Sequence, residues 1–177
     1  MNNNKVIKLI ENEAKKRELR PYYYRDENNN LWIGQQTAIF CLDSNFVLEN
    51  NWQERSMENI IPKITEDLMG ISLSSLQIND VYLNYKENVV ASVFLAKDCY
   101  TLVQTRYIDP FEKDKGRWLY KSIKGAAGHL IYVDEFERVK ALICSIYKKQ
   151  SESTKYEEQI LQLAAMLGKE EAGTDEP

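Results

Sequence analysis

Residues 119–147, LYKSIKGAAGHLIYVDEFERVKALICSIY, contain the densest apolar run of the chain and one of its clearest turn signals. Two interpretations of this stretch compete. In the first, residues 129–133 and 138–147 are the strands of a hairpin, and the polar residues 134–137 connect them. In the second, Asp134 caps a helix, since Glu137 follows it at the spacing of a capping box and the apolar residues beyond recur at helical intervals.

The run at 130–133, Leu-Ile-Tyr-Val, favours the hairpin, because β-branched and aromatic residues of this kind need a neighbouring strand. Residues 141–146 are apolar on both faces of a pleated strand, which is typical of a strand buried on both sides. We therefore expect this segment to close the core as a hairpin, with the helix as the alternative.

Earlier in the chain, the apolar residues of 5–19 fall mostly on one face and predict a helix, which Pro21 ends. An antiparallel meander is predicted over 22–42, with a turn at 26–30 and an interruption at 34–36. Ser56 is placed to cap a second helix at 57–69, and Gly70 ends it. The later strands are predicted at 72–78, 81–85, 89–95, 100–107 and 118–123, with a charged loop at 108–117 and a flexible link at 125–128.

These elements predict an α+β fold in which two helices pack on one face of a large antiparallel sheet or pair of sheets. Residues 1–150 are expected to form a single domain, because 177 residues suffice for one proper core. Residues 151–177 carry seven acidic residues against two lysines, a net charge of −5. We expect them to form an acidic tail with a short helix at 154–168 and a disordered end.

The sequence contains no catalytic signature, so we expect a protein that is not an enzyme and needs no cofactor. His129 is the only histidine, and Cys41, Cys99 and Cys144 lack the spacing of a zinc site. We expect three reduced, mostly interior thiols and no metal. No apolar run reaches the length of about 18 residues that suggests a membrane span. A cytoplasmic protein without an evident small-molecule ligand is the expectation.

The strongest binding candidate is the segment 113–124, KDKGRWLYKSIK, in which cations alternate with Trp118 and Tyr120. Single-strand binders use this mixture, stacking bases on aromatic rings beside cations that track the backbone. The competing interpretation is a solvated strand with its aromatic residues in the core, since alternate residues point to opposite faces. The candidate nucleic-acid or partner-binding residues are Arg106, Tyr107, Lys115, Arg117, Lys121 and Lys124.

Two stretches carry a resemblance to a known group of proteins. The opening at 10–33, a helix end followed by Pro21 and a tyrosine-rich strand, and the closing IYVDEFERVKALICSIY at 131–147 resemble small proteins of phages and mobile elements of Gram-positive bacteria. Their fold is similar to one domain of the DNA sliding clamp. The resemblance implies two helices inside a ring and antiparallel sheets outside, and it carries over no functional residue. The predicted helix at 57–69 departs from this pattern, because clamp helices that face DNA are basic and this one has Lys63 against three acidic residues.

We therefore expect a non-enzymatic interaction or accessory protein, with a protein partner or self-association. The alternative is a single-stranded nucleic-acid-binding protein that uses the basic and aromatic segment at 106–124. An enzyme with a site assembled from scattered carboxylates is a third hypothesis.

Overall fold

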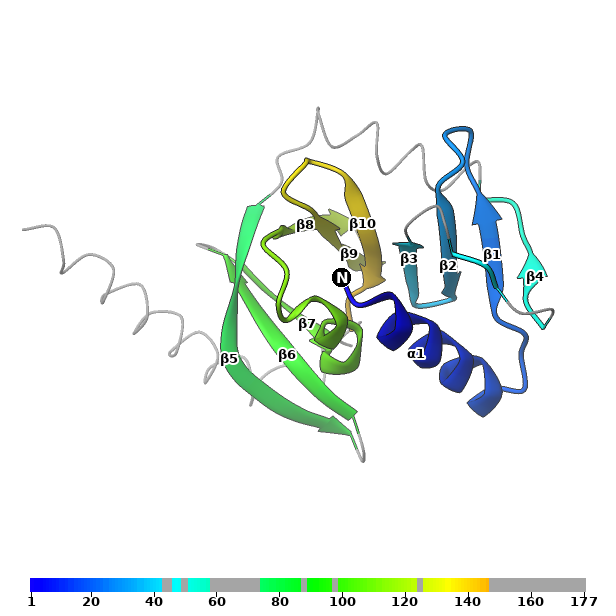
Figure 1. The fold of residues 1–177 in the computed structure, drawn as a ribbon. Helices are drawn as coiled ribbons and strands as arrows, with labels where there is room; N and C mark the ends of the chain where they lie inside the picture. The colour runs from blue at the N-terminus through cyan, green and yellow to red at the C-terminus, as the bar shows by residue number, and fades with distance from the viewer. Residues whose placement is uncertain are drawn as a thin grey trace, which may run out of the picture.

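The computed structural model describes residues 1–42, 46–48, 51–57, 74–86, 89–96, 99–123 and 126–146. Within these ranges the protein has an α+β fold, in which ten strands form one sheet in the order β4-β1-β2-β3-β10-β9-β8-β5-β6-β7 (Figure 1). The pair β1–β4 is parallel and the other described pairs are antiparallel. The elements are α1 (Asn3–Lys16), β1 (Tyr22–Arg25), β2 (Leu31–Gln35), β3 (Ala38–Leu42), β4 (Gln53–Glu54), β5 (Ser74–Lys86), β6 (Val89–Ala96), β7 (Cys99–Gln104), the 3₁₀ helices η2 (Thr105–Tyr107) and η3 (Asp109–Phe111), β8 (Arg117–Ile123), β9 (Ala126–Val133) and β10 (Val139–Cys144).

Helix α1 confirms the first predicted helix, at slightly earlier bounds. The side chain of Asn2 accepts a hydrogen bond from the Lys5 amide and caps the N-terminus. The helix ends before Pro21 because Glu18 adopts a left-handed conformation with φ 55°. Its buried face consists of Val6, Ile10, Glu13 and Ala14, and it packs across the strands in the middle of the molecule (Figure 1).

The predicted meander is confirmed in β1, β2 and β3. Strand β2 runs through Gly34 and Gln35, so the predicted interruption at 34–36 is wrong and the turn is limited to Gln36 and Thr37. Glycine suits this strand position, because a Cβ on Gly34 would come within 2.6 Å of the Ala38 carbonyl oxygen. The close approach of β3 therefore explains the glycine.

Strand β5 is one continuous strand, and the predicted division at 79–80 is wrong. The pairing register with β6 shifts between Ile78 and Tyr82, so a bulge absorbs the polar residues. Residues 74–76 pair with β8, whereas residues 77–86 pair with β6. The long, bent β5 thereby joins the two halves of the sheet (Figure 1).

The closing segment is the hairpin β9–β10, and the alternative helix is wrong. Strand β9 begins at Ala126, so 126–128 belongs to the sheet and the predicted flexible link is also wrong. Gly128 lies against the ring of Tyr120, and a Cβ on this glycine would overlap that ring. Glycine here makes room for a cross-strand aromatic side chain.

Beyond β10, the amide of Ile146 donates a hydrogen bond of 2.7 Å to the carbonyl of Leu102 in β7. The last strand of the sheet order thus lies beside the end of β10. The strands from β10 round to β7 therefore curl into an almost closed barrel.

Both faces of the central strands are buried. One face forms a cluster with α1 and η3, in which the Phe111 ring lies 4.3 Å from Tyr132 and 5.2 Å from Trp118 between ring centroids. The opposite face forms a second cluster that includes Trp32, Ile131 and Leu142. Burial on both sides explains why β10 is apolar at nearly every position, as the sequence predicted.

Two predicted elements lie outside the described residues. Of the helix predicted at 57–69, the structure describes Met57 alone, which is buried in the second cluster. The tail 151–177, with its predicted helix at 154–168, also lies outside them. No helix in the described ranges is long and apolar enough to cross a membrane.

Candidate functional site

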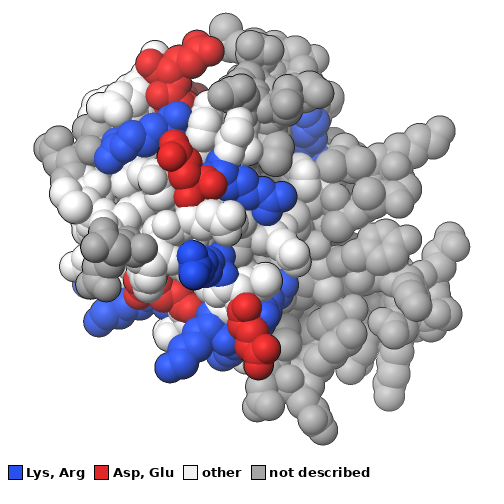
Figure 2. Space-filling view, turned by 90° about the vertical axis from the view of Figure 1, so that its right-hand side faces the viewer, with Lys and Arg blue, Asp and Glu red and all other residues white. Residues whose placement is uncertain are grey.

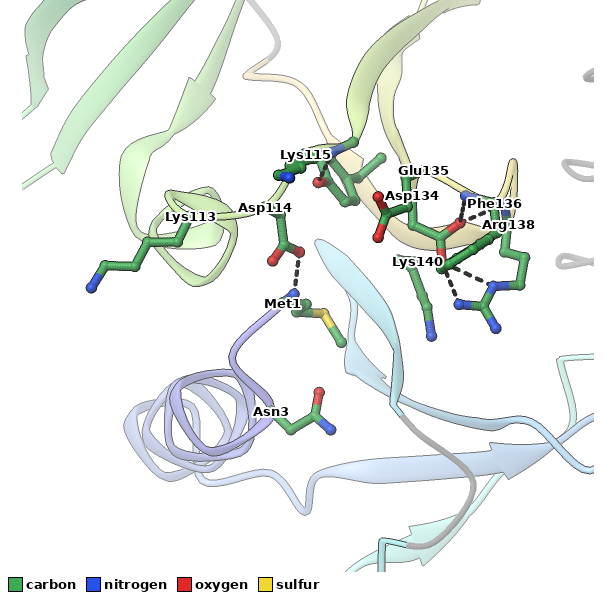
Figure 3. Close-up of a pocket in the computed structure, with 12 residues that line it drawn as sticks. Met1, Asn3, Lys113, Asp114, Lys115, Asp134, Glu135, Phe136, Arg138 and Lys140 are labelled. Atoms are coloured by element: carbon green, nitrogen blue, oxygen red, sulfur yellow. Dashed lines mark hydrogen bonds and ion pairs between the residues drawn. The ribbon is translucent and has the colours of Figure 1, made fainter.

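A charged cavity of about 370 Å³ lies where the start of the chain meets the loop 112–116 and the tip of the β9–β10 hairpin. Figure 3 shows Met1 and Asp114 on one side of the opening and Asp134, Arg138 and Lys140 on the other. The basic residues that line it are Lys113, Lys115, Arg138 and Lys140, and the acidic ones are Asp114, Asp134 and Glu135.

The start of the chain forms the first wall of the charged cavity. The Met1 amino group forms an ion pair with the carboxylate of Asp114. The Asn2 amide donates a 2.9 Å hydrogen bond to the carbonyl of Pro110, and Lys5 lies 3.6 Å from the Glu112 carboxylate. These contacts hold the first turn of α1 against the loop that carries the lysines.

The hairpin tip forms the opposite wall, and Asp134 fixes its shape. One carboxylate oxygen accepts hydrogen bonds from the amides of Phe136 and Arg138 at 2.9 and 3.0 Å, and the other accepts from Arg138 Nε at 2.9 Å. Burial acts to raise the pKa of Asp134, but the hydrogen bonds from Arg138 and Phe136 outweigh it and hold that pKa below its ordinary value of 3.8. The tip is therefore a preformed turn with an ionised aspartate.

An exposed aromatic ring stands at the rim. Phe136 is 68% exposed, and the guanidinium carbon of Arg138 lies 5.0 Å from its ring centroid. Large apolar side chains in water are common on protein surfaces when they occur singly. This one is held beside a cation at a cavity mouth, which makes it a contact candidate.

The floor of the charged cavity is Tyr132, whose hydroxyl accepts a 2.7 Å hydrogen bond from the Gly116 amide. Burial raises the pKa of Tyr132, so its hydroxyl stays protonated at neutral pH. A Cβ on Gly116 would overlap the Tyr132 ring, and this contact explains the glycine at the end of the loop. The loop is thus fixed to the sheet on which the cavity rests.

Positive charge is only partly compensated within the charged cavity. Asp114 and Asp134 are committed to the Met1 amino group and to Arg138. For Lys113 and Lys115, no ion pair is found with any residue that the structure describes. Both lysines line the cavity, and Figure 3 shows the Lys113 side chain extending away from the opening. The arrangement suits a ligand segment that brings negative charge to Lys115.

Two residues of the predicted binding segment are committed to internal contacts. Arg106 forms an ion pair with Glu13 of α1 and also donates to Gln104. Tyr107 is 1% exposed, and its hydroxyl bonds to Gln35 Nε2 at 3.0 Å and to Thr37 Oγ1 at 2.8 Å. Arg106 thus joins η2 to α1, and Tyr107 joins η2 to the end of β2 and the β2–β3 turn.

The remaining predicted residues do not gather on one surface. Lys115 lines the charged cavity, and Arg117 forms an ion pair with Glu137 of the neighbouring hairpin. Lys121 lies opposite His129 in the β8–β9 ladder, and Lys124 lies outside the described residues. Among the predicted residues that are described, the structure places only Lys115 in this cavity.

Sequence reasoning missed the hairpin half of the charged cavity. Asp134, Phe136, Arg138 and Lys140 were assigned to a connection and a strand, because nothing local shows that Met1 and the loop 112–116 lie next to them. The spacing of four residues between Asp134 and Arg138 was a signal for a bonded turn. The pairing of Met1 with Asp114 had no sequence signal.

Charges of both signs are also interspersed elsewhere. On the side of the molecule that carries β1 and β4, basic and acidic side chains alternate among the coloured residues without a broad basic field (Figure 2). Within the described ranges, no group of three or more His, Cys, Asp or Glu side chains is placed to hold a metal ion. No protein-family model, no curated protein and no solved structure matches this chain.

Proposed function

We propose that the protein is a non-enzymatic interaction or accessory protein that binds a segment of another protein at the charged cavity. The observation that carries the proposal is the combination of Lys115, for which no ion pair is found among the described residues, with the 68% exposed Phe136 on the opposite rim. A cation and an apolar ring around a concave site suit an acidic protein segment with an apolar anchor.

The mixed charge of the lining favours protein over nucleic acid as the partner. Asp114, Asp134 and Glu135 would lie close to any chain that enters the charged cavity. A phosphate backbone carries a negative charge at every nucleotide, including those that would lie beside the carboxylates. A protein segment can instead place an acidic side chain at Lys115 and apolar or neutral side chains beside the carboxylates. The partner chemistry we infer is therefore an acidic and apolar peptide segment.

A single-stranded nucleic acid is the second candidate, and one observation favours it. Phe136 and Arg138 offer a stacking platform next to Lys115 and Lys140, which is the mixture of aromatic and cationic groups that single-strand binders use. The sequence alone predicted a nucleic-acid-binding surface over the whole segment 106–124. Of that segment, the part that lines the cavity is 113–116.

The experiment selects peptides from a displayed random library on the full-length protein, with counter-selection on the Lys115→Glu/Phe136→Ala variant. The affinities of a selected peptide and of an oligothymidylate are then measured by fluorescence anisotropy. We expect acidic peptides with an apolar residue, bound about tenfold more weakly by each single variant. Lys8→Glu is the matched control, since Lys8 is exposed on α1 outside the cavity.

Two outcomes would contradict the proposal. If the selected peptides bind the Lys115→Glu/Phe136→Ala variant equally well, the charged cavity is not their binding site. Tight, salt-sensitive oligothymidylate binding that is lost in the same variant would move the assignment to the nucleic-acid function.

The resemblance to sliding-clamp-like proteins of phages and mobile elements is part of the same proposal, together with a cytoplasmic location and self-association. It rests on residues 10–33 and 131–147, and the α+β class is compatible with it. Light scattering on the full chain tests it. A discrete oligomer would support a protein that assembles into a ring, and a monomer at high concentration would exclude ring assembly.

A further inference from the structure

A second cavity of about 460 Å³ lies on the sheet face opposite helix α1. It lies between β1, β3, the β9–β10 pair and the segment 55–57. We call it the β-face cavity. Its floor is apolar and includes Ile39, Met57 and Leu142, which belong to or pack against the second core cluster. The volume lies within the range of small-molecule sites, and a mostly apolar lining with a few convergent polar groups is typical of them.

Two of the polar groups that line the β-face cavity come from neighbouring strands. His129 and Cys144 are paired residues in the β9–β10 ladder, so both side chains lie on the cavity face. Burial lowers the pKa of His129, although a hydrogen bond to the Gly128 backbone opposes this, and the imidazole is neutral at pH 7. A neutral imidazole with one nitrogen bonded to the backbone presents the other to a ligand.

Among the described residues that line the β-face cavity, the cation is Arg55, which lies at the mouth. The guanidinium carbon of Arg55 lies 5.3 Å from the ring centroid of Tyr22, and both residues line the cavity. Arginine stays charged at every ordinary pH. No carboxylate is among the described residues that line this cavity. One cation without an opposing acidic residue favours an anionic ligand.

Catalysis by the paired thiol and imidazole does not follow from this arrangement. Burial raises the pKa of Cys144, so the thiol is protonated at neutral pH and is a weak nucleophile. Its sulfur lies 4.0 Å from the Gln36 carbonyl oxygen, a hydrogen-bond acceptor that does not activate a thiol. The pair is suited to line a binding site.

We propose that the β-face cavity binds a small organic carboxylate with a flat apolar body. The carboxylate pairs with Arg55 at the mouth, where guanidinium and carboxylate match in two parallel hydrogen bonds. The apolar body lies on Ile39, Met57 and Leu142, and His129 bonds to a polar edge of the ligand. The site is separate from the charged cavity and does not depend on the function proposed for that cavity.

The test uses 2-naphthoate as the probe and 2-naphthamide as its neutral isostere, with the full-length protein. Methyl NMR spectra are recorded during titration. We expect saturable shifts of the Ile39, Met57 and Leu142 methyl signals with naphthoate and weaker binding of naphthamide. The Arg55→Gln variant loses about tenfold in naphthoate affinity, because a charged hydrogen-bonded partner is removed, and its naphthamide affinity is unchanged. Arg20→Gln is the matched control, since Arg20 is exposed and lies outside the cavity.

A second readout needs no variant. Alkylation of Cys144 by iodoacetamide, followed by peptide mapping, is expected to slow in the presence of naphthoate because the probe covers the thiol. The proposal is overturned if the methyl signals show no saturable shift, if acid and amide bind equally, or if Arg55→Gln binds naphthoate as the unaltered protein does.

Discussion

Glu13 of α1 and Arg106 of η2 form an ion pair in which the carboxylate side chain is 5% exposed and the guanidinium side chain 35% exposed. The same carboxylate lies 3.2 Å from Lys16 Nζ. A charge this deeply buried is held only when it is paired and hydrogen-bonded. This ion pair therefore fixes α1 to the chain that follows β7, and it gives Arg106 a structural role.

Replacing Glu13 with Gln is expected to lower the free energy of unfolding by about 1–3 kcal/mol, because it leaves Arg106 partly buried without its anion. Urea denaturation at neutral pH measures the change. Glu11→Gln on the same helix is the control, since no ion pair is found for Glu11 within the described ranges. An equal loss in both variants would show that the Glu13 pair contributes nothing specific.

Replacing Tyr107 with Phe removes the hydroxyl that bonds to Gln35 and Thr37. Gln35 is buried, and its Oε1 already has no hydrogen-bond partner among the described residues. We expect a loss of about 1–3 kcal/mol, the usual cost of a buried polar group left unpaired. Thermal unfolding of Tyr107→Phe is compared with that of Tyr107→Phe/Gln35→Leu. The comparison separates the cost of the unpaired Gln35 side chain from the cost of the lost hydrogen bond to Thr37. The double variant should recover part of the stability, and no recovery would place the cost in the lost hydrogen bond to Thr37.

Two aspartates predict how stability depends on acid pH. Burial acts to raise the pKa of Asp26, but hydrogen bonds from Trp32, Asn30 and Asn28 outweigh it and lower that pKa below 3.8. Asp134 has a lowered pKa for a similar reason. Their stabilising contribution is complete above the unfolded pKa and is lost as the pH falls through the folded pKa.

The unfolding free energy should therefore decline as the pH drops below the ordinary aspartate pKa of 3.8. The Asp26→Asn/Asp134→Asn variant should decline less over the same interval, measured as urea midpoints across pH. Parallel curves for the two proteins would contradict the assignment of the acid sensitivity to these turns.

His129 predicts a second, milder pH effect. Burial lowers its pKa from 6.5, and the positive charge of Lys121 lowers it further. The unfolded chain takes up a proton first as the pH falls below about 6.5, so stability decreases from there down to the folded pKa. An NMR titration of the imidazole signal measures the pKa of His129. The signal needs no assignment to a residue, since this is the only histidine in the sequence. Lys121→Gln should raise the pKa partway, and a full return to 6.5 would show that burial is not the main cause.

The sequence predicted the fold well where side-chain chemistry acts locally. The Asn and Asp turn at 26–30, the end of α1 before Pro21 and the hairpin at 129–144 were all confirmed, because turn residues and β-branched runs determine their own backbone. The alternative helix, capped by Asp134 and continuing to residue 147, was wrong for a non-local reason. A strand buried on both faces is apolar at most positions and mimics a helical face.

The sequence-based predictions were wrong where the role of a glycine or a polar side chain depends on a residue far away in the sequence. Gly128 was interpreted as a link, yet it makes room for Tyr120. Arg106 and Tyr107 were predicted to be candidate binding residues, yet they bond to Glu13, Gln35 and Thr37, which lie far away in the sequence. The charged cavity had the same difficulty, since it joins three segments that only the folded chain brings together.

The hydrogen bond from Ile146 to Leu102 also bears on how the protein is made. Leu102 is synthesised long before Ile146, so β7 can pair with β6 along one edge while its other edge stays open. Such edges pair readily with other unfolded chains. The barrel is sealed only after residue 146 has emerged, and the nascent chain is expected to depend on a chaperone during that interval.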